Sequence, residues 1–466
     1  METFGERIAL IEDNGESITY AKLREKGQEL YGKINRRCLV FVLASNSIGS
    51  VVGYCSFLEN RVVPVMLGRG TDRELIGSLI NIYSPSYLWV PSADADSFKD
   101  FAPVYSDCGY TLLKTDLPAE YGLYDELALL LTTSGSTGSP KFVRQSYRNI
   151  KANTGSIIEY LKIGENERPI TTLPMNYTYG LSIINTHLYV GATVLLTDRT
   201  LMQKEFWKFL KEQNATSFGG VPYTYEMLDK LRFYRMELPS LRTMTQAGGK
   251  LTPELHAKFA EYAANSNRSF VVMYGQCEAT ARMGYLPAHK AVEKKGSMGI
   301  AIPGGEFSLI DASGNKIVTP YTPGELVYRG ENVTLGYAEC SADLAKGDER
   351  HGVLETGDMA QFDEDGYYYI VGRKKRFLKI YGNRVNLDET DRLIKGKFNI
   401  DAACAGIDDH MFIFLTDEAM SDAVKDYITA TTKLNPAAFR TVIIPEIPRN
   451  DSGKTKYSEL EKYYDI

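Results

Sequence analysis

The sequence has few residues of the types that bind transition metals or form disulfides. It contains six cysteines and five histidines in 466 residues. No two cysteines show C-x-x-C spacing and no two histidines show H-x-x-H-like spacing, so we expect neither a zinc site nor a disulfide framework. The chemistry of this chain must therefore come from other residue types.

Long apolar runs and an excess of positive charge are also missing. No apolar run reaches the ~18 residues that a membrane-spanning helix needs, and the N-terminus lacks the basic-then-apolar layout of a signal peptide. The formal net charge of −6 provides no broad basic surface for nucleic acid. We expect a cytoplasmic protein with no membrane span and no nucleic-acid partner.

Apolar runs and helical patterns alternate along most of the chain. The run at residues 38–43 is continuously apolar, as buried parallel strands are, and similar runs recur at residues 62–67, 87–90, 127–131, 170–173, 193–197 and 270–273. Helical patterns occur at residues 20–34, 204–212 and 222–231. The alternation predicts an α/β fold with mainly parallel sheets and layers of helices. Beyond Glu325, shorter strands predict an antiparallel subdomain, and the length of the chain predicts two or more domains.

Residues 130–141 form the most informative stretch of the sequence: Leu-Leu-Thr-Thr-Ser-Gly-Ser-Thr-Gly-Ser-Pro-Lys. An apolar strand leads into a loop of glycines and hydroxyl residues that ends on Lys141. Glycine lets the backbone approach a ligand closely, and successive loop N–H groups can form a concave anion site. A P-loop would place Ser or Thr after the lysine, whereas Phe142 follows here. We predict a polyphosphate-binding loop of another kind.

This loop resembles the phosphate loop of the AMP-forming adenylating enzyme superfamily, which includes acyl-CoA synthetases, nonribosomal adenylation domains and beetle luciferases. Further stretches resemble the other motifs of that superfamily, in the same order: Met273–Ala279, Gly324–Gly330, Glu355–Asp358, Gly372–Lys375 and Pro448–Lys454. The resemblance implies a large N-terminal domain at residues 1–374 and a small, mobile α+β C-terminal domain at residues 375–466.

The resemblance also implies a two-step reaction. A carboxylic acid attacks the α-phosphate of ATP, which releases pyrophosphate and leaves an acyl-adenylate, and a thiol then takes the acyl group. The implied cofactors are ATP with Mg²⁺, and the implied acceptor is CoA or the phosphopantetheine of an acyl carrier protein. Catalysis of the first step should depend on positioning and on charge stabilisation.

Individual roles follow from matching positions in the motifs. The resemblance implies that Lys454, Glu278 and Lys141 are catalytic, that Glu278 is the magnesium ligand, that Lys375 is the hinge and that Gly382 borders the pantetheine channel. The positions implied to bind the nucleotide are Thr133, Ser134, Gly135, Ser136, Thr137, Gly138, Gly248, Gly249, Tyr274, Gly275, Cys277, Asp358 and Arg373.

Cys277 departs from the family pattern, which usually places Thr there to donate a hydrogen bond to the α-phosphate. Cysteine is a weak donor. The neighbouring Thr280 is a candidate to supply the missing hydroxyl.

Residues 173–181 resemble the segment that lines the acyl pocket, with Tyr177, Tyr179 and Gly180 as the pocket positions. No acid lies between Tyr177 and Leu181, and a buried ammonium without a partner is costly, so a standard α-amino acid is disfavoured. The two tyrosines suit an aryl or medium aliphatic acid, although they are also compatible with an ordinary core.

Several functions share these motifs. We favour a carboxylate–CoA ligase, and the alternative is a stand-alone enzyme that loads an acyl carrier protein. A luciferase-like oxygenase is a third possibility that nothing in the sequence singles out. A non-catalytic relative would be expected to lack Lys454, Glu278 or Asp358, and all three are present.

Overall fold

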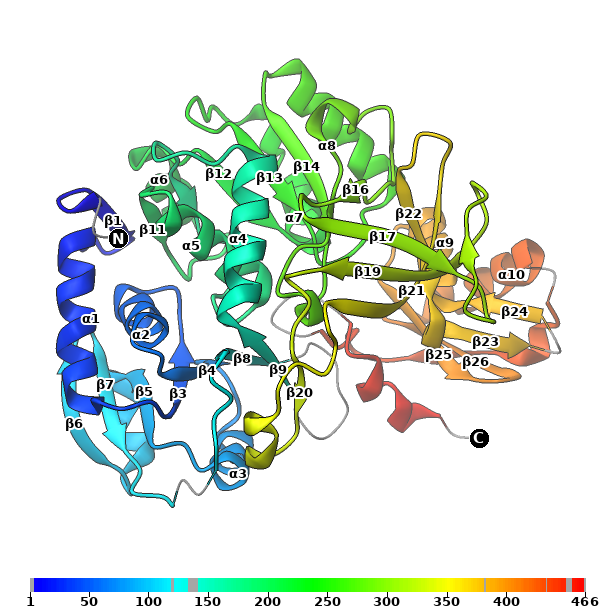
Figure 1. The fold of residues 1–466 in the computed structure, drawn as a ribbon. Helices are drawn as coiled ribbons and strands as arrows, with labels where there is room; N and C mark the ends of the chain where they lie inside the picture. Colours follow the sequence, from blue (N-terminus) through cyan, green and yellow to red (C-terminus); the bar gives the residue numbers. More distant parts are fainter. Residues whose placement is uncertain are drawn as a thin grey trace.

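The computed structural model describes residues 4–118, 121–132, 141–380, 383–432, 434–449 and 455–464. Two large sheets dominate it (Figure 1). In the described residues, the first sheet has nine strands, in the order β16 (Ile300–Ala301), β15 (Gly284–Tyr285), β14 (Ser269–Tyr274), β13 (Thr243–Gln246), β12 (Ser217–Gly220), β10 (Pro169–Ile170), β11 (Val194–Leu196), β1 (Ile8–Glu12) and β2 (Ser17–Thr19).

The second large sheet has eight strands within the same described ranges. Their order is β20 (Gly336–Ala338), β9 (Phe142–Ser146), β8 (Leu127–Thr132), β4 (Val63–Gly68), β3 (Leu39–Ala44), β5 (Tyr87–Pro91), β7 (Tyr110–Lys114) and β6 (Ala102–Asp107). In both sheets the central strands run parallel and the outer strands pair antiparallel. The predicted α/β class is confirmed.

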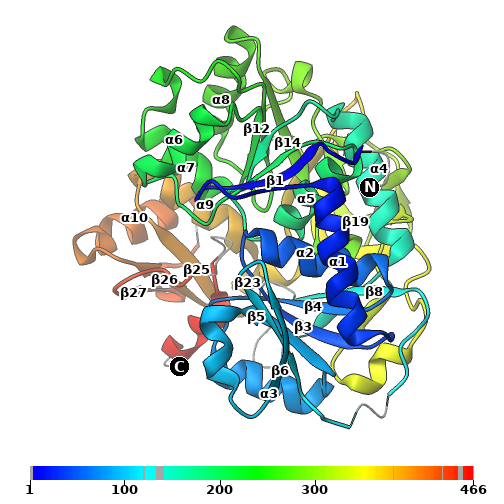
Figure 2. The same ribbon diagram turned by 90° about the vertical axis from the view of Figure 1, so that its left-hand side faces the viewer.

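Helices separate and cover these sheets (Figure 2). Their bounds are α1 (Tyr20–Ile34), α2 (Ile48–Glu59), α3 (Arg73–Tyr83), α4 (Tyr147–Leu161), α5 (Thr178–Tyr189), α6 (Lys204–Glu212), α7 (Pro222–Lys230), α8 (Pro253–Asn265), α9 (Leu387–Phe398) and α10 (Ser421–Thr432). One hydrophobic cluster joins α1, α2 and α5 to strands of both large sheets, and this cluster is the core of the layered part. None of the described helices is both long and apolar enough to cross a membrane.

An antiparallel sheet follows, as the sequence predicts, but it starts earlier than Glu325. Its order is β18 (Lys316–Ile317), β17 (Gly305–Ile310), β19 (Gly324–Gly330), β21 (Val353–Phe362) and β22 (Tyr368–Arg373). The run expected at residues 170–173 is likewise shorter than expected, because only Pro169 and Ile170 pair as β10. Apolar composition indicates that such segments are strands, whereas pairing with distant strands sets the residues at which the strands begin and end.

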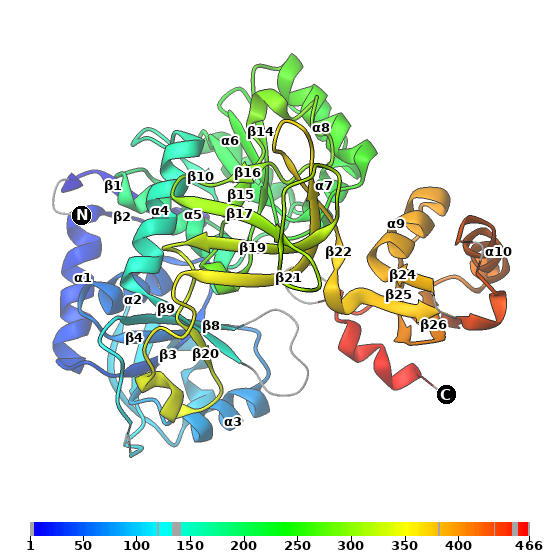
Figure 3. The ribbon, with the colours of Figure 1, turned by 45° about the vertical axis from the view of Figure 1, so that its right-hand side comes forward.

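The elements after residue 376 form sheets of their own (Figure 3). They are β23 (Phe377–Ile380) with β24 (Asn383–Asn386), and β25 (Ala402–Ile407) with β26 (His410–Leu415) and β27 (Phe439–Ile443). Two hydrophobic clusters lie wholly within this part of the chain. Lys395 of α9 reaches back to Glu226 of α7 with an N–O distance of 2.5 Å, which ties the two parts together.

Candidate active site

The predicted nucleotide motif lies at the carboxyl end of β14, a central strand of the nine-stranded sheet. The chain turns sharply there into a single 3₁₀ turn, η4 (Cys277–Ala279). Gly275 permits the turn, because a Cβ at this position would lie 1.8 Å from the carbonyl oxygen of Ala281. The turn therefore presents the side chains of residues 274–278 at the end of the sheet, where α/β proteins commonly bind ligands.

Asp358 lies directly beside this turn. Its Oδ2 accepts a hydrogen bond of 2.5 Å from the Tyr274 hydroxyl and one of 2.9 Å from Gln276 Nε2. Arg373, opposite Asp358 in the β21–β22 register, places Nε 3.3 Å from Oδ1. Burial, with Asp358 acting in the same direction, raises the pKa of Tyr274 well above its usual value, so Tyr274 stays a hydrogen-bond donor. The three predicted residues Tyr274, Asp358 and Arg373 thus converge, and Gln276 joins them.

Glu278 lies on the other side of the turn and contacts a residue that sequence reasoning missed. The Tyr337 hydroxyl donates to Glu278 Oε1 at 2.8 Å. The backbone carbonyl of Glu278 accepts from the N–H and the hydroxyl of Thr334, at 3.0 and 2.9 Å. Burial, with Glu278 acting in the same direction, raises the pKa of Tyr337 to about 12. Tyr337 lies in no motif quoted above, and only the pairing of β20 with β9 brings it here.

Two cations flank Tyr337. Lys141 Nζ lies 5.4 Å from the ring centroid, and the Arg350 guanidinium lies 4.7 Å from it. Lys141 also forms an ion pair of 2.8 Å with Glu339. The predicted catalytic residues Lys141 and Glu278 therefore meet at one aromatic ring, and the positive charges beside it suit an anionic group.

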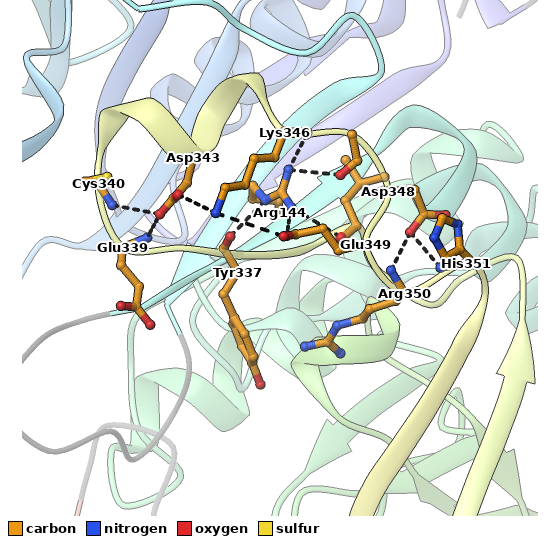
Figure 4. A network of polar contacts seen from close by, with 12 residues as sticks. Arg144, Tyr337, Glu339, Cys340, Asp343, Lys346, Asp348, Glu349, Arg350 and His351 are labelled. Atoms are coloured by element: carbon orange, nitrogen blue, oxygen red, sulfur yellow. Dashed lines mark hydrogen bonds and ion pairs between the residues drawn. The ribbon is translucent and has the colours of Figure 1, made fainter.

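A buried arginine holds the segment that carries Tyr337 (Figure 4). The Arg144 side chain is fully buried, and it donates to the carbonyls of Tyr337 (2.9 Å), Leu335 (3.3 Å) and Gly347 (3.2 Å). It also bonds the carbonyl of Lys346 and the carboxylate of Glu349. Every nitrogen of this guanidinium has an acceptor, so its burial is compensated.

Cys277, which stands where the family usually has threonine, is surrounded by other side chains. Cys277 is buried, and its sulfur lies 3.6 Å from the Thr178 hydroxyl. Thr280 cannot replace the missing threonine as suggested from the sequence, because its hydroxyl is buried and donates to the carbonyl of Asn332 at 2.7 Å. The backbone of Thr280 has φ +66° and ψ −66°, close to the central residue of a classic γ-turn. Thr178 is the hydroxyl that the fold places next to the sulfur.

The predicted acyl-pocket residues begin α5. Tyr177 is the N-cap residue of α5, and its ring centroid lies 6.3 Å from that of Tyr179. The hydroxyl of Tyr179 lies 2.8 Å from Thr245 Oγ1. Gly180 has no space for a side chain, since a Cβ would lie 2.3 Å from the carbonyl oxygen of Pro174. Both tyrosines belong to a hydrophobic cluster with residues of β14 and of the loop after β13.

The glycine pair follows β13 in that loop. Gly248 has a φ of +83°, which favours glycine. A Cβ on Gly249 would lie 2.9 Å from the ring of Pro222, and Gln246 Nε2 donates to the Gly249 carbonyl at 2.8 Å. The pair thus lies at the same end of the sheet as Tyr274.

Other predicted site residues lie outside the described residues. They are the phosphate-loop positions Thr133, Ser134, Gly135, Ser136, Thr137 and Gly138, together with Gly382 and Lys454. The backbone of Lys375 lies in the 3₁₀ turn η7 (Lys374–Arg376), which joins β22 to β23.

The chain is similar to known proteins in sequence and in fold. A family model described as AMP-binding enzyme matches residues 1–338. The 2-succinylbenzoate–CoA ligase of Bacillus pumilus (strain SAFR-032) is 27% identical over 98% of this chain and 95% of its own length. The oxalate–CoA ligase of Arabidopsis thaliana is 28% identical over 73% of this chain and 68% of its own. The structure of o-succinylbenzoate CoA synthetase from Bacillus subtilis with its acyl-adenylate intermediate superposes with a TM-score of 0.81 at 21% identity, covering 98% of this chain and 95% of that one.

Proposed function

Because this chain belongs to the AMP-binding enzyme family, we propose that it is an AMP-forming carboxylate–CoA ligase. It activates a carboxylic acid with ATP to an acyl-adenylate and transfers the acyl group to the thiol of CoA. The named relatives are CoA ligases, which supports CoA as acceptor. Those relatives act on oxalate and 2-succinylbenzoate, acids of very different size, so the acid must be inferred from this chain's own pocket.

The observation that carries the proposal is that two separate polar clusters lie on either side of one turn. Asp358, Tyr274 and Gln276 form a polar cluster on one side of residues 275–278, and Glu278, Tyr337 and Lys141 form another on the other side. The first cluster offers a buried carboxylate to the ribose hydroxyls, which are hydrogen-bond donors. The second joins cations and a carboxylate, as a metal–polyphosphate site requires.

Each residue then has a defined task in adenylation. Asp358 holds the ribose, and Tyr274 positions that carboxylate and offers its ring to adenine. Lys141 and Lys454 stabilise the negative charge that moves between the carboxylate and the α-phosphate. A glutamate oxygen suits Mg²⁺, so Glu278 would hold the ion, which neutralises phosphate charge.

The second half-reaction depends on the C-terminal part. We place the boundary between the two domains at residues 374–375, where β22 gives way to η7 and the separate sheets begin. Rotation about Lys375 brings the C-terminal domain into a second orientation, in which Gly382 borders the pantetheine channel. An acyl carrier protein is the alternative acceptor, because it carries the same pantetheine arm.

The direct test is product analysis by mass spectrometry. The purified protein is incubated with ATP, Mg²⁺ and CoA and a pool of carboxylic acids that includes amino acids. Acyl-CoA supports the proposal, and acyl-AMP without acyl-CoA favours the carrier-protein alternative. Asp358→Ala should lose product, whereas Asp365→Ala, an exposed aspartate of the nearby turn, should not. Absence of both acyl-AMP and acyl-CoA with every acid would refute the proposal.

A further inference from the structure

Arg282 is a buried arginine that forms no ion pair with an acidic side chain among the residues that the structure describes. It lies between η4 and β15 with 2% of its surface exposed. Its Nη2 donates to the Ser182 hydroxyl at 3.1 Å, and the guanidinium carbon lies 3.7 Å from the centroid of the Tyr179 ring. Nε and Nη1 have no hydrogen-bond partner in the part of the chain that the structure describes. Buried polar groups are nearly always bonded, so these two donors require an explanation.

The backbone of Arg282 is held rigidly. Asn153 of α4 bonds it twice, since its Oδ1 accepts from the Arg282 N–H at 3.2 Å and its Nδ2 donates to the Arg282 carbonyl at 2.8 Å. Asn332 Nδ2 donates to the same carbonyl at 2.9 Å. Two distant segments therefore fix the backbone of Arg282, from which the side chain extends to Ser182 and Tyr179.

The guanidinium lines a pocket between α4, α5 and the strands β12 and β13. The cavity volume is about 40 Å³, which is room for about three water molecules or for one small end group of a ligand. Its walls combine apolar side chains such as Ile157 and Phe218 with the hydroxyls of Ser182 and Thr186. Apolar walls with a few convergent polar groups are typical of ligand sites, and a cavity of this size takes the end group of a ligand and not a whole molecule.

The other ionisable groups of this pocket do not neutralise Arg282. Glu167 lies on the wall, but its carboxylate bonds Arg242 at 3.0 Å and the hydroxyl of Thr216. His187 is buried, which lowers its pKa to about 4, so its ring is neutral at pH 7. Its Nδ1 donates to the Ile183 carbonyl at 2.8 Å, and Nε2 has no partner among the described residues. Among the described residues that line the pocket, Arg282 therefore carries a positive charge without an acidic partner.

Tyr179 links this pocket to the proposed active site. Its ring lies against the Arg282 guanidinium and neighbours the ring of Tyr177. Thr178, which lies between the two tyrosines in the chain, contacts the sulfur of Cys277 in the nucleotide motif. The Tyr179 hydroxyl contacts Thr245, which also lines the pocket. An acid whose reacting carboxylate lies at the nucleotide would extend past the two tyrosines toward Arg282.

We propose that the substrate is a carboxylic acid with a second anionic group at its far end, a dicarboxylate, and that Arg282 binds this second group. This inference rests on the proposed function and specifies its substrate class. A carboxylate accepts from the unpaired N–H donors and compensates the buried charge. His187 Nε2 accepts from a hydroxyl or a water that accompanies the ligand.

The test compares matched acids and matched variants. The ratio kcat/KM is measured for glutarate against pentanoate and for phthalate against benzoate. The wild type should prefer the dicarboxylate of at least one pair by about 10²-fold. Arg282→Met should lower kcat/KM for that dicarboxylate by about 10²–10³-fold, because a buried carboxylate loses its partner. Its effect on the monocarboxylate should be less than about threefold, and Arg282→Lys should recover part of the loss. Arg148→Met, at an exposed position of α4, is the control and should change nothing.

The other outcomes would overturn either the role of Arg282 or the proposed function. Equal loss for both members of a pair would mean that Arg282 only supports the fold, and a wild type that prefers the monocarboxylates would overturn the inference while leaving the ligase activity intact. If no acid gives any product, the proposed function fails. Calorimetric titration with glutarate and phthalate then decides whether Arg282 binds an anion. Binding to the wild type that Arg282→Met abolishes would support the anion site, and no binding would overturn it.

Discussion

Two buried arginines of this protein should respond in opposite ways to the same substitution. Arg144 and Arg282 are both almost fully shielded from solvent. Arg144 has an acceptor for each nitrogen, whereas Arg282 leaves Nε and Nη1 unpaired. Methionine keeps much of the volume of the arginine stem and removes the charge. Comparing Arg144→Met with Arg282→Met therefore shows how much the hydrogen-bond acceptors around a buried arginine contribute to stability.

The magnitudes follow from the contacts. Arg144→Met removes the donor for four carbonyls and one carboxylate, and breaking such a compensated buried network costs about 3–5 kcal/mol. Arg282→Met loses one hydrogen bond, worth about 1 kcal/mol, and one cation–π contact, worth about 1–2 kcal/mol. It also removes a desolvated charge whose burial costs several kcal/mol. The expected net change for Arg282→Met without ligand is between zero and about 2 kcal/mol of stabilisation.

Differential scanning calorimetry without ligand is the assay. Arg144→Met should lower the transition temperature of the N-terminal part, and Arg282→Met should leave it unchanged or raise it. If Arg282→Met destabilised the protein as much as Arg144→Met, its charge would already be compensated in the fold. The case for an anion pocket would then fail.

Four further predictions concern single positions. Glu278→Gln should lower the adenylation rate by about 10²-fold and raise the Mg²⁺ concentration needed, as a magnesium titration of pyrophosphate release would reveal. Lys454→Ala should lose adenylation by about 10²–10³-fold but keep thioester formation from supplied acyl-adenylate; equal loss in both assays would remove its assigned role. Gly275→Ala should cost about 1–3 kcal/mol in urea unfolding and most of the activity, since its Cβ would overlap the Ala281 carbonyl; a wild-type midpoint would show that the turn can relax. The folded-state pKa of His187 is about 4, below the unfolded value, so its contribution to stability is lost as pH falls from about 6.5 toward 4. The free energy of urea unfolding should therefore drop by about 2 kcal/mol more between pH 7 and pH 5 for the wild type than for His187→Phe, and equal slopes would contradict this.

Local patterns predicted much of the secondary structure. The helices at residues 20–34 and 204–212 have the bounds that the sequence predicts, because apolar spacing and capping act over a few residues. Thr19 caps the first of them by accepting from the Lys22 N–H. Continuous apolar runs likewise marked the buried strands β3 and β14. The end of β10 was placed less well and β17 was not predicted, because both strands depend on pairing with distant segments.

The site could be predicted only as a set of residue types in motifs. The motif around Tyr274 and the aspartate at residue 358 were recognisable, since each is a short local stretch. Their hydrogen bond joins residues 84 positions apart, and it exists because β21 lies beside the turn after β14. Tyr337 gave no local signal, and it reaches Glu278 across 59 positions through the pairing of β20 with β9.

The sequence by itself determined the family of this protein, the adenylating enzymes, and the short motifs that carry its candidate lysines and carboxylates. Only the tertiary structure decided which of these side chains are paired. Arg144 and Arg282 are the same residue type, and both are almost fully buried. Remote segments of the described chain supply acceptors to every nitrogen of Arg144 but to only one nitrogen of Arg282, because burial and hydrogen bonding depend on how distant elements pack. That difference points to the acid that this enzyme activates.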